Sequence, residues 1–227
     1  GGPVMLLPSD RFWSMSFGSD SRKRRYFEMW TESGRDEAGG TSQAIGGGMT
    51  YRPTSAMRIS ISPRYSRNHE KMQYVTQVED AAYHATYGKR YLFATLDQRT
   101  VDIGIRTEWT MSSRLSFQLY LQPFVSSGDY KGFKYLTRPR EFDFTHISDA
   151  QADAEAGNPD FNYRSVRGSA VVRWEFRPGS AMYVVWNENR EESIDRGDFR
   201  LRRDFGALPN APSQDVFLIK FSYWLPM

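Results

Sequence analysis

The sequence predicts an all-β fold, an antiparallel up-and-down transmembrane β-barrel of roughly nine or more strands, of which this chain is the C-terminal portion. Three observations predict this fold. Apolar and polar residues alternate along segments of about 11 residues, aromatic residues lie near the ends of these segments, and short and long connections alternate between them. The chain of 227 residues has no cysteine, which excludes a disulfide framework and a thiolate metal site.

The clearest alternation lies in residues 100–110, where Val101, Ile103 and Ile105 share one face and Asp102 and Arg106 the other. Segments of about 11 residues exceed the roughly 5–6 typical of soluble strands and match the roughly 9–11 of a tilted membrane strand. Other alternating segments occupy residues 57–66, 115–122, 166–177 and 217–223. The aromatic residues expected to form an interfacial girdle are Tyr65, Trp109, Trp174, Phe176 and Tyr223.

Connection lengths predict the two rims of the barrel. Tight periplasmic turns are expected at residues 52–55, 111–114 and 177–180, and long extracellular loops near residues 31–42, 68–98, 126–163 and 189–214. Within residues 68–98, two apolar stretches could form an extracellular hairpin, continue the neighbouring strands, or add two membrane strands. These stretches are residues 72–78 and 91–96.

Strand parity indicates a partial barrel. If the last strand runs toward the periplasm and each preceding strand runs in the opposite direction to the next, the chain contains roughly nine strands. Bacterial single-chain barrels have an even number. We therefore expect residues 1–227 to form one β domain whose remaining strands come from upstream sequence. The opening GGPVMLLPSD lacks the charged n-region and full apolar h-region of a signal peptide, so the true N-terminus is expected further upstream.

Several segments, in their order and spacing, resemble one family. They are DSRKR (residues 20–24), GRDEAGG (34–40), LDQRT (96–100), LSFQLYLQPFVSSGDYKGFK (115–134), FNYRSVRG (161–168), VVRWEFRPGS (171–180) and FLIKFSYW (217–224). The chain resembles the C-terminal barrel of an uncharacterised family of bacterial outer-membrane proteins that carry an N-terminal carbohydrate-binding domain similar to family nine. The resemblance implies a barrel in the outer membrane and a link to glycans. It supplies no catalytic residues, and the chain lacks the carbohydrate-binding domain and the first barrel strands.

Polar side chains opposite the apolar ones are candidates to line the lumen, because a charge facing lipid costs about 2–4 kcal/mol at the bilayer midplane. They either select solutes or form cross-strand ion pairs that rigidify the barrel. The candidates are Arg58, Arg64, Asp102, Arg106, Glu108, Gln118, Arg167, Arg173, Glu175 and Lys220.

Aromatic residues of the expected loops could stack on sugars or pack among themselves to close the barrel mouth. The glycan-contact candidates are Tyr130, Phe133 and Tyr135. The C-terminal strand could carry the signal that the barrel-insertion machinery reads, in Phe217, Phe221, Tyr223 and Trp224, or simply close the sheet.

Catalysis has little support in the sequence. The acidic segment 141–160 matches no known calcium-loop spacing, and we expect no metal site and no cofactor. Gly46–Gly48 lacks the Lys-Ser/Thr of a phosphate loop, so close packing or bending is the expected role of these glycines. Asp153 and Glu155 could act as acid and base in a surface glycan hydrolase, but such pairs arise by chance in acidic loops.

We therefore expect a non-enzymatic outer-membrane module, a pore or a membrane anchor, that is linked to surface carbohydrate binding or uptake. The expected partners are the lipid bilayer, the insertion machinery, the upstream part of the barrel and glycans. A net charge of +3, from 30 basic and 27 acidic residues, argues against nucleic acid. The alternatives are a soluble all-β binding domain, whose apolar face packs on a second sheet, and the hydrolase.

Overall fold

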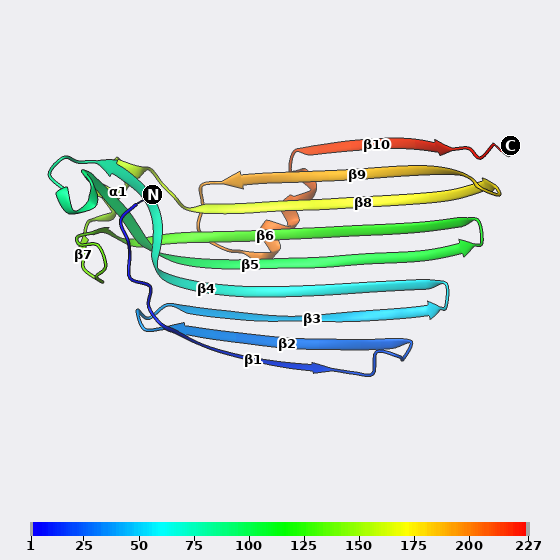
Figure 1. Ribbon diagram of the computed structural model, residues 1–227, viewed down its shortest axis with the longest axis horizontal. Helices are drawn as coiled ribbons and strands as arrows, with labels where there is room; N and C mark the ends of the chain where they lie inside the picture. The colour runs from blue at the N-terminus through cyan, green and yellow to red at the C-terminus, as the bar shows by residue number, and fades with distance from the viewer. Residues whose placement is uncertain (1, 226–227) are drawn as a thin grey trace.

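The computed structural model describes residues 2–225 and contains a single antiparallel sheet of ten strands (Figure 1). Nine strands follow one another in chain order, and the short strand β7 pairs only with β6. The strands are β1 (Asp10–Gly18), β2 (Arg25–Asp36), β3 (Thr41–Thr54), β4 (Met57–Glu79), β5 (Lys89–Ser112), β6 (Leu115–Leu136), β7 (Phe144–His146), β8 (Phe161–Arg177), β9 (Ser180–Ile194) and β10 (Ser213–Ser222).

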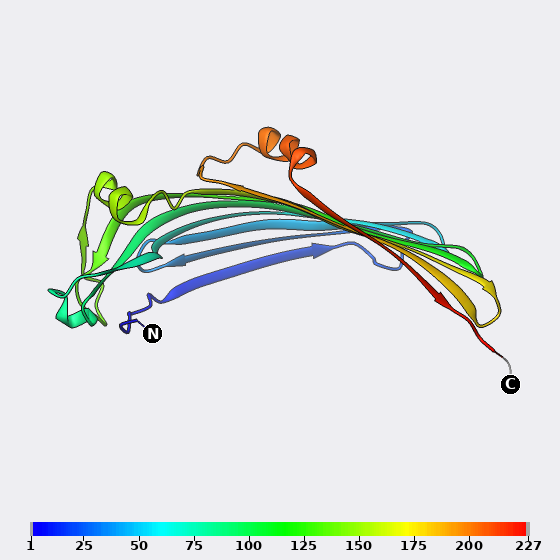
Figure 2. The ribbon, with the colours of Figure 1, turned by 90° about the horizontal axis from the view of Figure 1, so that it is seen from above.

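The all-β, up-and-down prediction is confirmed, including nine strands joined in sequence. The sheet is open rather than closed, because β1 and β10 each pair on one side only. Figure 2 shows that the sheet is bowed, with helices α1 (Asp149–Ala156) and α2 (Leu201–Ala207) on its convex side and the N-terminal segment on the other side. No helix of residues 2–225 is long and apolar enough to cross a membrane.

Tight turns cluster at one end of the sheet. The predicted turns at residues 111–114 and 177–180 are present, because β5 ends at Ser112 before β6 and β8 ends at Arg177 before β9. The second turn uses Gly179, whose φ of 78° suits glycine. The turn predicted at residues 52–55 lies slightly later, because β3 continues to Thr54 and β4 begins at Met57.

The opposite end is more regular than the expected long loops. β2 and β3 are joined by residues 37–40 alone, and strands occupy much of the ranges 68–98, 126–163 and 189–214. In residues 68–98, β4 and β5 continue and also pair with each other, up to Glu79 and Lys89. Apolar and polar residues do not alternate regularly in these extensions, because each face meets either water or a local core. Their backbone N–H and C=O groups are still hydrogen-bonded between the paired strands.

The extended ends of β4, β5 and β6 carry the only substantial buried core among the described residues. One cluster contains Leu92, Ala94, Phe133 and Tyr135, with Ala152 of α1 packed against them. A second cluster joins Tyr91, Phe93 and Leu136 with Met5 of the N-terminal segment and Phe144. Two short 3₁₀ turns are also present, η1 (His84–Thr86) between β4 and β5 and η2 (Leu208–Asn210) after α2. The connection between β9 and β10, residues 195–212, contains α2 and η2 and is called the α2 segment below.

Candidate functional site: the two faces of the sheet

One face of the nine-stranded sheet is largely apolar. Cross-strand partners share a face, and the row containing Ile61, Ile105 and Leu121 runs from Phe27 on β2 to Gly168 on β8, beyond which its members on β9 and β10 are Glu188 and Asp215. The side chains of this apolar face are Trp13, Met15, Phe17, Phe27, Met29, Thr31, Ile45, Gly47, Met49, Tyr51, Met57, Ile59, Ile61, Pro63, Tyr65, Val101, Ile103, Ile105, Thr107, Trp109, Leu115, Phe117, Leu119, Leu121, Pro123, Val125, Val166, Gly168, Ala170, Val172, Trp174, Met182, Val184, Trp186, Phe217, Ile219 and Phe221. These side chains are uncharged, but the same rows also contain charged residues, among them Arg25 opposite Tyr51, Glu188 opposite Gly168, Arg190 opposite Val166, and Asp215 opposite Glu188.

This apolar face is the convex one. Arg190 and Asn162 lie on the same face, Arg190 in the row of Val166 and Asn162 beyond the last apolar row of β8, and both contact the α2 segment. The Arg190 Nη1 donates to the carbonyl oxygen of Pro209 at 2.7 Å, and the Asn162 Nδ2 donates to that of Asp198 at 3.5 Å. The α2 segment covers only the part of this face near Arg190 and Asn162. No second layer of strands covers the apolar face within residues 2–225.

The two edge strands are exposed throughout. Every residue of β1 and β10 is exposed, including Phe217 at 70% and Trp13 at 55%. β10 contains four consecutive apolar residues, from Val216 to Ile219, so both of its faces are apolar at that point. A long, apolar, unpaired edge is a template for a further strand.

The opposite, concave face carries the predicted lumen candidates. The register places all of them there: Arg58, Arg64, Asp102, Arg106, Glu108, Gln118, Arg167, Arg173, Glu175 and Lys220. The face also holds serine, threonine and glutamine, together with Val171, Val185 and Leu218 in one row near β10.

Charges on the concave face are held by aromatic rings as well as by ion pairs. Arg173 and Glu175 pair along one strand at 2.9 Å. Arg64 lies opposite Asp102 in the register, yet within the described chain no ion pair of 4.0 Å or less joins them. The Arg64 guanidinium instead lies 5.4 Å from the ring centroid of Trp30, and that of Arg106 lies 4.9 Å from the Tyr120 ring.

The glycines of β3 make this aromatic packing possible. A Cβ on Gly46 would lie 2.4 Å from the Trp30 ring, and one on Gly48 would lie 2.8 Å from the Glu28 carboxylate. A Cβ on Gly47 would lie 2.7 Å from the backbone oxygen of Glu28. The prediction that this glycine run serves close packing is confirmed.

A comparison with protein families matches residues 2–227 to a single family. The chain belongs to the DUF5916 family, a domain of unknown function. A search of curated proteins found no match to this chain. The family match covers every strand of the sheet.

In this DUF5916 domain, the loop aromatics lie in the core at the extended end. Phe133 and Tyr135 are only 3% and 2% exposed, so neither ring offers a face to a sugar, and the self-packed alternative describes them. Tyr130 is half-buried and packs against the same core. Burial and the nearby Asp160 carboxylate raise the pKa of its phenol.

Glu155 is the most constrained carboxylate of the acidic segment. Its carboxylate accepts hydrogen bonds from the Tyr135 hydroxyl and from the Gln151 side chain at 3.0 Å, and it pairs with Arg90 at 3.2 Å. Burial opposes ionisation, but these hydrogen bonds and the Arg90 charge outweigh it and lower the pKa of Glu155. A general acid needs the opposite shift, whereas the neighbouring Asp153 is simply exposed.

The other acidic residues of this segment are dispersed. Glu141 and Asp143 both pair with Arg138, at 3.4 and 3.3 Å. Asp160 accepts a hydrogen bond from the backbone N–H of Tyr130, and burial raises its pKa. Among residues 2–225, no group of three or more His, Asp or Glu side chains is placed to hold a metal ion.

The C-terminal aromatics divide between two environments. Phe217 and Phe221 project from the apolar face of β10. The Tyr223 hydroxyl accepts a hydrogen bond from Arg177 Nη1 at 2.6 Å, and the Trp224 backbone N–H donates to the Ser180 hydroxyl at 3.0 Å. The last turn of the sheet therefore anchors the end of the described chain.

Proposed function

We propose that this DUF5916 domain is the C-terminal portion of an outer-membrane β-barrel, with its convex face against lipid and its concave face toward the lumen. The observation that carries the proposal is the convex face, which is apolar over most of the nine strands and has no second layer of strands over it within residues 2–225. A contiguous apolar surface of this extent is unstable in water and marks an interaction with a membrane or another protein.

The apolar face has the height of a bilayer core. On β6 it extends from Leu115 to Val125, a length of about 11 residues. At a rise of about 3.3 Å per residue and a tilt of about 45°, such a strand covers roughly 25 Å, the height of the apolar band of outer-membrane barrels. Trp109 and Trp174 near the tight turns and Tyr65 near the other limit have the positions of interfacial aromatics.

The directions of the edge strands favour a partial barrel. Nine antiparallel strands in sequence leave β1 and β10 with the same direction, so pairing them with each other would give a parallel contact. Closure by antiparallel pairs alone requires an odd number of further strands between them. We infer that upstream sequence supplies these strands, which also remove the two exposed edges.

The proposed role is non-enzymatic, as a pore or as an anchor for a surface module. The polar concave face supports a hydrated lumen, and the resemblance to barrels that carry a carbohydrate-binding domain supports a link to surface glycans. Conductance of the full-length protein in a planar bilayer distinguishes the two roles, because a plugged anchor passes no current.

A soluble binding domain is the alternative from another class. It requires that the apolar face be covered by a second layer of protein, so it predicts a monodisperse protein without detergent. The membrane proposal predicts aggregation without detergent and insertion into vesicles.

Paired substitutions on the neighbouring strands β5 and β6 test the orientation. Ile105→Arg places a charge on the convex face near mid-height, whereas Gln118→Arg places one on the concave face opposite Glu108. We expect Ile105→Arg to reduce the stability of the vesicle-inserted protein by about 2–4 kcal/mol and Gln118→Arg to change it little. Equal effects of the two substitutions on urea unfolding in vesicles would contradict the proposal.

A further inference from the structure

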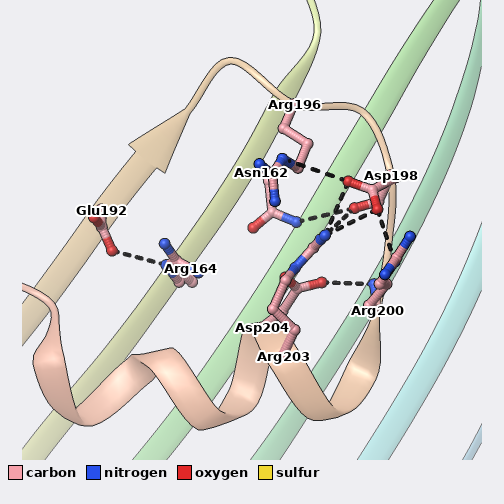
Figure 3. A network of polar contacts seen from close by, with 8 residues as sticks. All are labelled: Asn162, Arg164, Glu192, Arg196, Asp198, Arg200, Arg203 and Asp204. Carbon is pink, nitrogen blue, oxygen red and sulfur yellow. Dashed lines mark hydrogen bonds and ion pairs between the residues drawn. The ribbon is translucent and has the colours of Figure 1, made fainter.

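The α2 segment lies on the lipid side of the sheet rather than over its polar face. Asn162 and Arg164 of this face lie beside the segment (Figure 3), and Val125, the neighbour of Arg164 on β6, belongs to the apolar face and is fully buried. The row of Val125 contains Tyr65 and Val101 on one side and Arg164 and Glu192 on the other. On β4, β5 and β6 this row is the last apolar one, whereas on β9 and β10 charged residues begin earlier, at Glu188, Arg190 and Asp215.

Three arginines of this segment converge on a single carboxylate. Arg196, Arg200 and Arg203 each have a guanidinium nitrogen near the Asp198 carboxylate, at 3.7, 3.0 and 2.9 Å (Figure 3). Arg203 is also paired with the buried Asp204 at 2.7 Å. The cluster therefore contains more positive than negative charge.

The excess charge is on the outside of the cluster. Arg200 and Arg196 are 74% and 54% exposed, whereas Arg203 is 28% exposed and lies against the sheet. Arg202 is exposed and has no ion pair of 4.0 Å or less among the residues that the structure describes. The hydrogen bond from Arg203 and the charges of the three arginines lower the pKa of Asp198, so its carboxylate stays ionised.

Beneath the cluster, most polar groups are paired, although the buried Oδ1 of Asn162 has no hydrogen-bond partner among the described residues. Arg164 donates to Glu192 at 2.8 Å, and the backbone N–H of Arg200 donates to Asp204 at 2.7 Å (Figure 3). The segment is therefore fixed to the sheet by one set of contacts, while Arg196, Arg200 and Arg202 remain exposed. Leu201, between Arg200 and Arg202 in the sequence, is 55% exposed.

We propose that Arg196, Arg200 and Arg202 form a binding site for the phosphate groups of a membrane lipid in the leaflet nearest the extended ends of the strands. The inference rests on the proposed membrane orientation and adds a ligand to it. Guanidinium groups pair with phosphate oxygens bidentately, and arginine at the lipid side of a barrel is tolerated at the interface but not at mid-height. Leu201 enters the acyl boundary beside the phosphates, as in interfacial helices.

The location favours a lipid over a soluble anion. The cluster lies on the same convex face as the apolar side chains and at their limit, which is the level of headgroup phosphates in the proposed orientation. A soluble anion would need no such continuity with the lipid-facing surface.

The experiment uses the full-length protein in phosphatidylcholine vesicles that contain diphosphoryl lipid A. After mild detergent extraction, native mass spectrometry measures the lipid A retained per protein. The test variant combines Arg196→Gln, Arg200→Gln and Arg202→Gln and keeps Arg203, which holds the segment in place. The control variant combines Arg138→Gln and Arg140→Gln, which are exposed at the extended end of the sheet. Heat-modifiable migration on a gel checks insertion of every variant.

We expect the triple variant to insert normally and to lose affinity for diphosphoryl lipid A by at least about tenfold, since each arginine near a charged surface contributes about a factor of five. The control should retain the lipid as the wild type does, and monophosphoryl lipid A should bind more weakly. Equal retention by the triple variant, or complete displacement by excess inorganic phosphate, would overturn the lipid site alone. Failure of the wild-type protein to insert would instead overturn the membrane orientation on which the site rests.

Discussion

The hydroxyl of Tyr135 on β6 donates a hydrogen bond to the carboxylate of Glu155 on α1, which joins the sheet to the helix at its extended end. Arg90 of β5 lies beside both, with its guanidinium 4.5 Å from the Tyr135 ring centroid. Asp80 approaches Arg90 from the β4–β5 connection at 3.0 Å. Four separate chain segments therefore meet in one small, largely buried polar group.

Tyr135→Phe is expected to loosen α1 without disturbing the rest of the sheet. The substitution removes a hydrogen bond to a charged group, worth about 1.5–3 kcal/mol, and leaves the ring in place. Hydrogen exchange should show faster exchange of the amides of α1 (Asp149–Ala156) and unchanged exchange in β8. Asp153→Asn on the exposed side of the same helix is the control, and faster exchange in that variant too would mean that the hydrogen bond is unimportant.

The same group should make the docking of α1 sensitive to pH at both extremes. The pKa of Glu155 lies below its ordinary 4.5, so the stabilisation is present above that value and is lost as pH falls through the lowered pKa. Burial raises the pKa of Tyr135 from 10.0 to about 12, so the neutral phenol stabilises the docking below pH 10 and loses this effect between those values. Limited proteolysis of residues 137–160 across pH measures both limits. Glu155→Gln should abolish the acid limit and move the alkaline limit to lower pH, because the Glu155 carboxylate also raises the pKa of Tyr135.

Gly46→Ala should destabilise the sheet, whereas Gly104→Ala should be neutral or stabilising. A Cβ at Gly46 meets the Trp30 ring at 2.4 Å and displaces the contact between Trp30 and Arg64, while a Cβ at Gly104 meets nothing closer than 3.9 Å. Overpacking of this kind costs about 1–3 kcal/mol, and removal of a strand glycine gains roughly 0.5–1 kcal/mol. Urea unfolding of the two variants in vesicles gives the comparison, and the same change in midpoint for both would show that the indole moves freely.

The full-length protein should contain an odd number of barrel strands in addition to the nine found here. This follows from the common direction of β1 and β10 and from antiparallel closure. A strand count from an experimental structure of the full-length protein decides it. An even number of additional strands would mean that the barrel closes through a parallel pair.

Much of the fold could be predicted because a sheet between two different environments imposes strict alternation. Residues such as Val101, Ile103 and Ile105 lie on the predicted face, and the turns after Ser112 and Arg177 carry clear turn residues. The extensions of β4 and β5 correspond to one of the interpretations of residues 72–78 and 91–96. The extension of β6 could not be predicted, because β6 beyond Val125 contains serine, glycine and aspartate and has no single apolar face.

The helices and the α2 site were missed for different reasons. α1 has a usable signal, with Ser148 accepting a hydrogen bond from the Gln151 N–H and an alanine-rich run after it. At the N-cap of α2, no side chain of the N-cap residue makes a capping hydrogen bond, so the helix has no such sequence signal. Its arginines are spread along a segment whose sequence resembles a polar loop. Only the folded segment shows Arg196, Arg200 and Arg203 around one carboxylate.

The unequal strand lengths also set a distance. On β5 the apolar face stops at Val101, while the strand itself begins at Lys89, so roughly 35–40 Å of hydrogen-bonded backbone continues beyond it. In the proposed orientation, this extension is a rigid projection from the membrane. The N-terminal segment packs against one face of its tip and α1 packs against the other. In that orientation, a molecule that approaches from this side would meet the tip first, away from the bilayer surface.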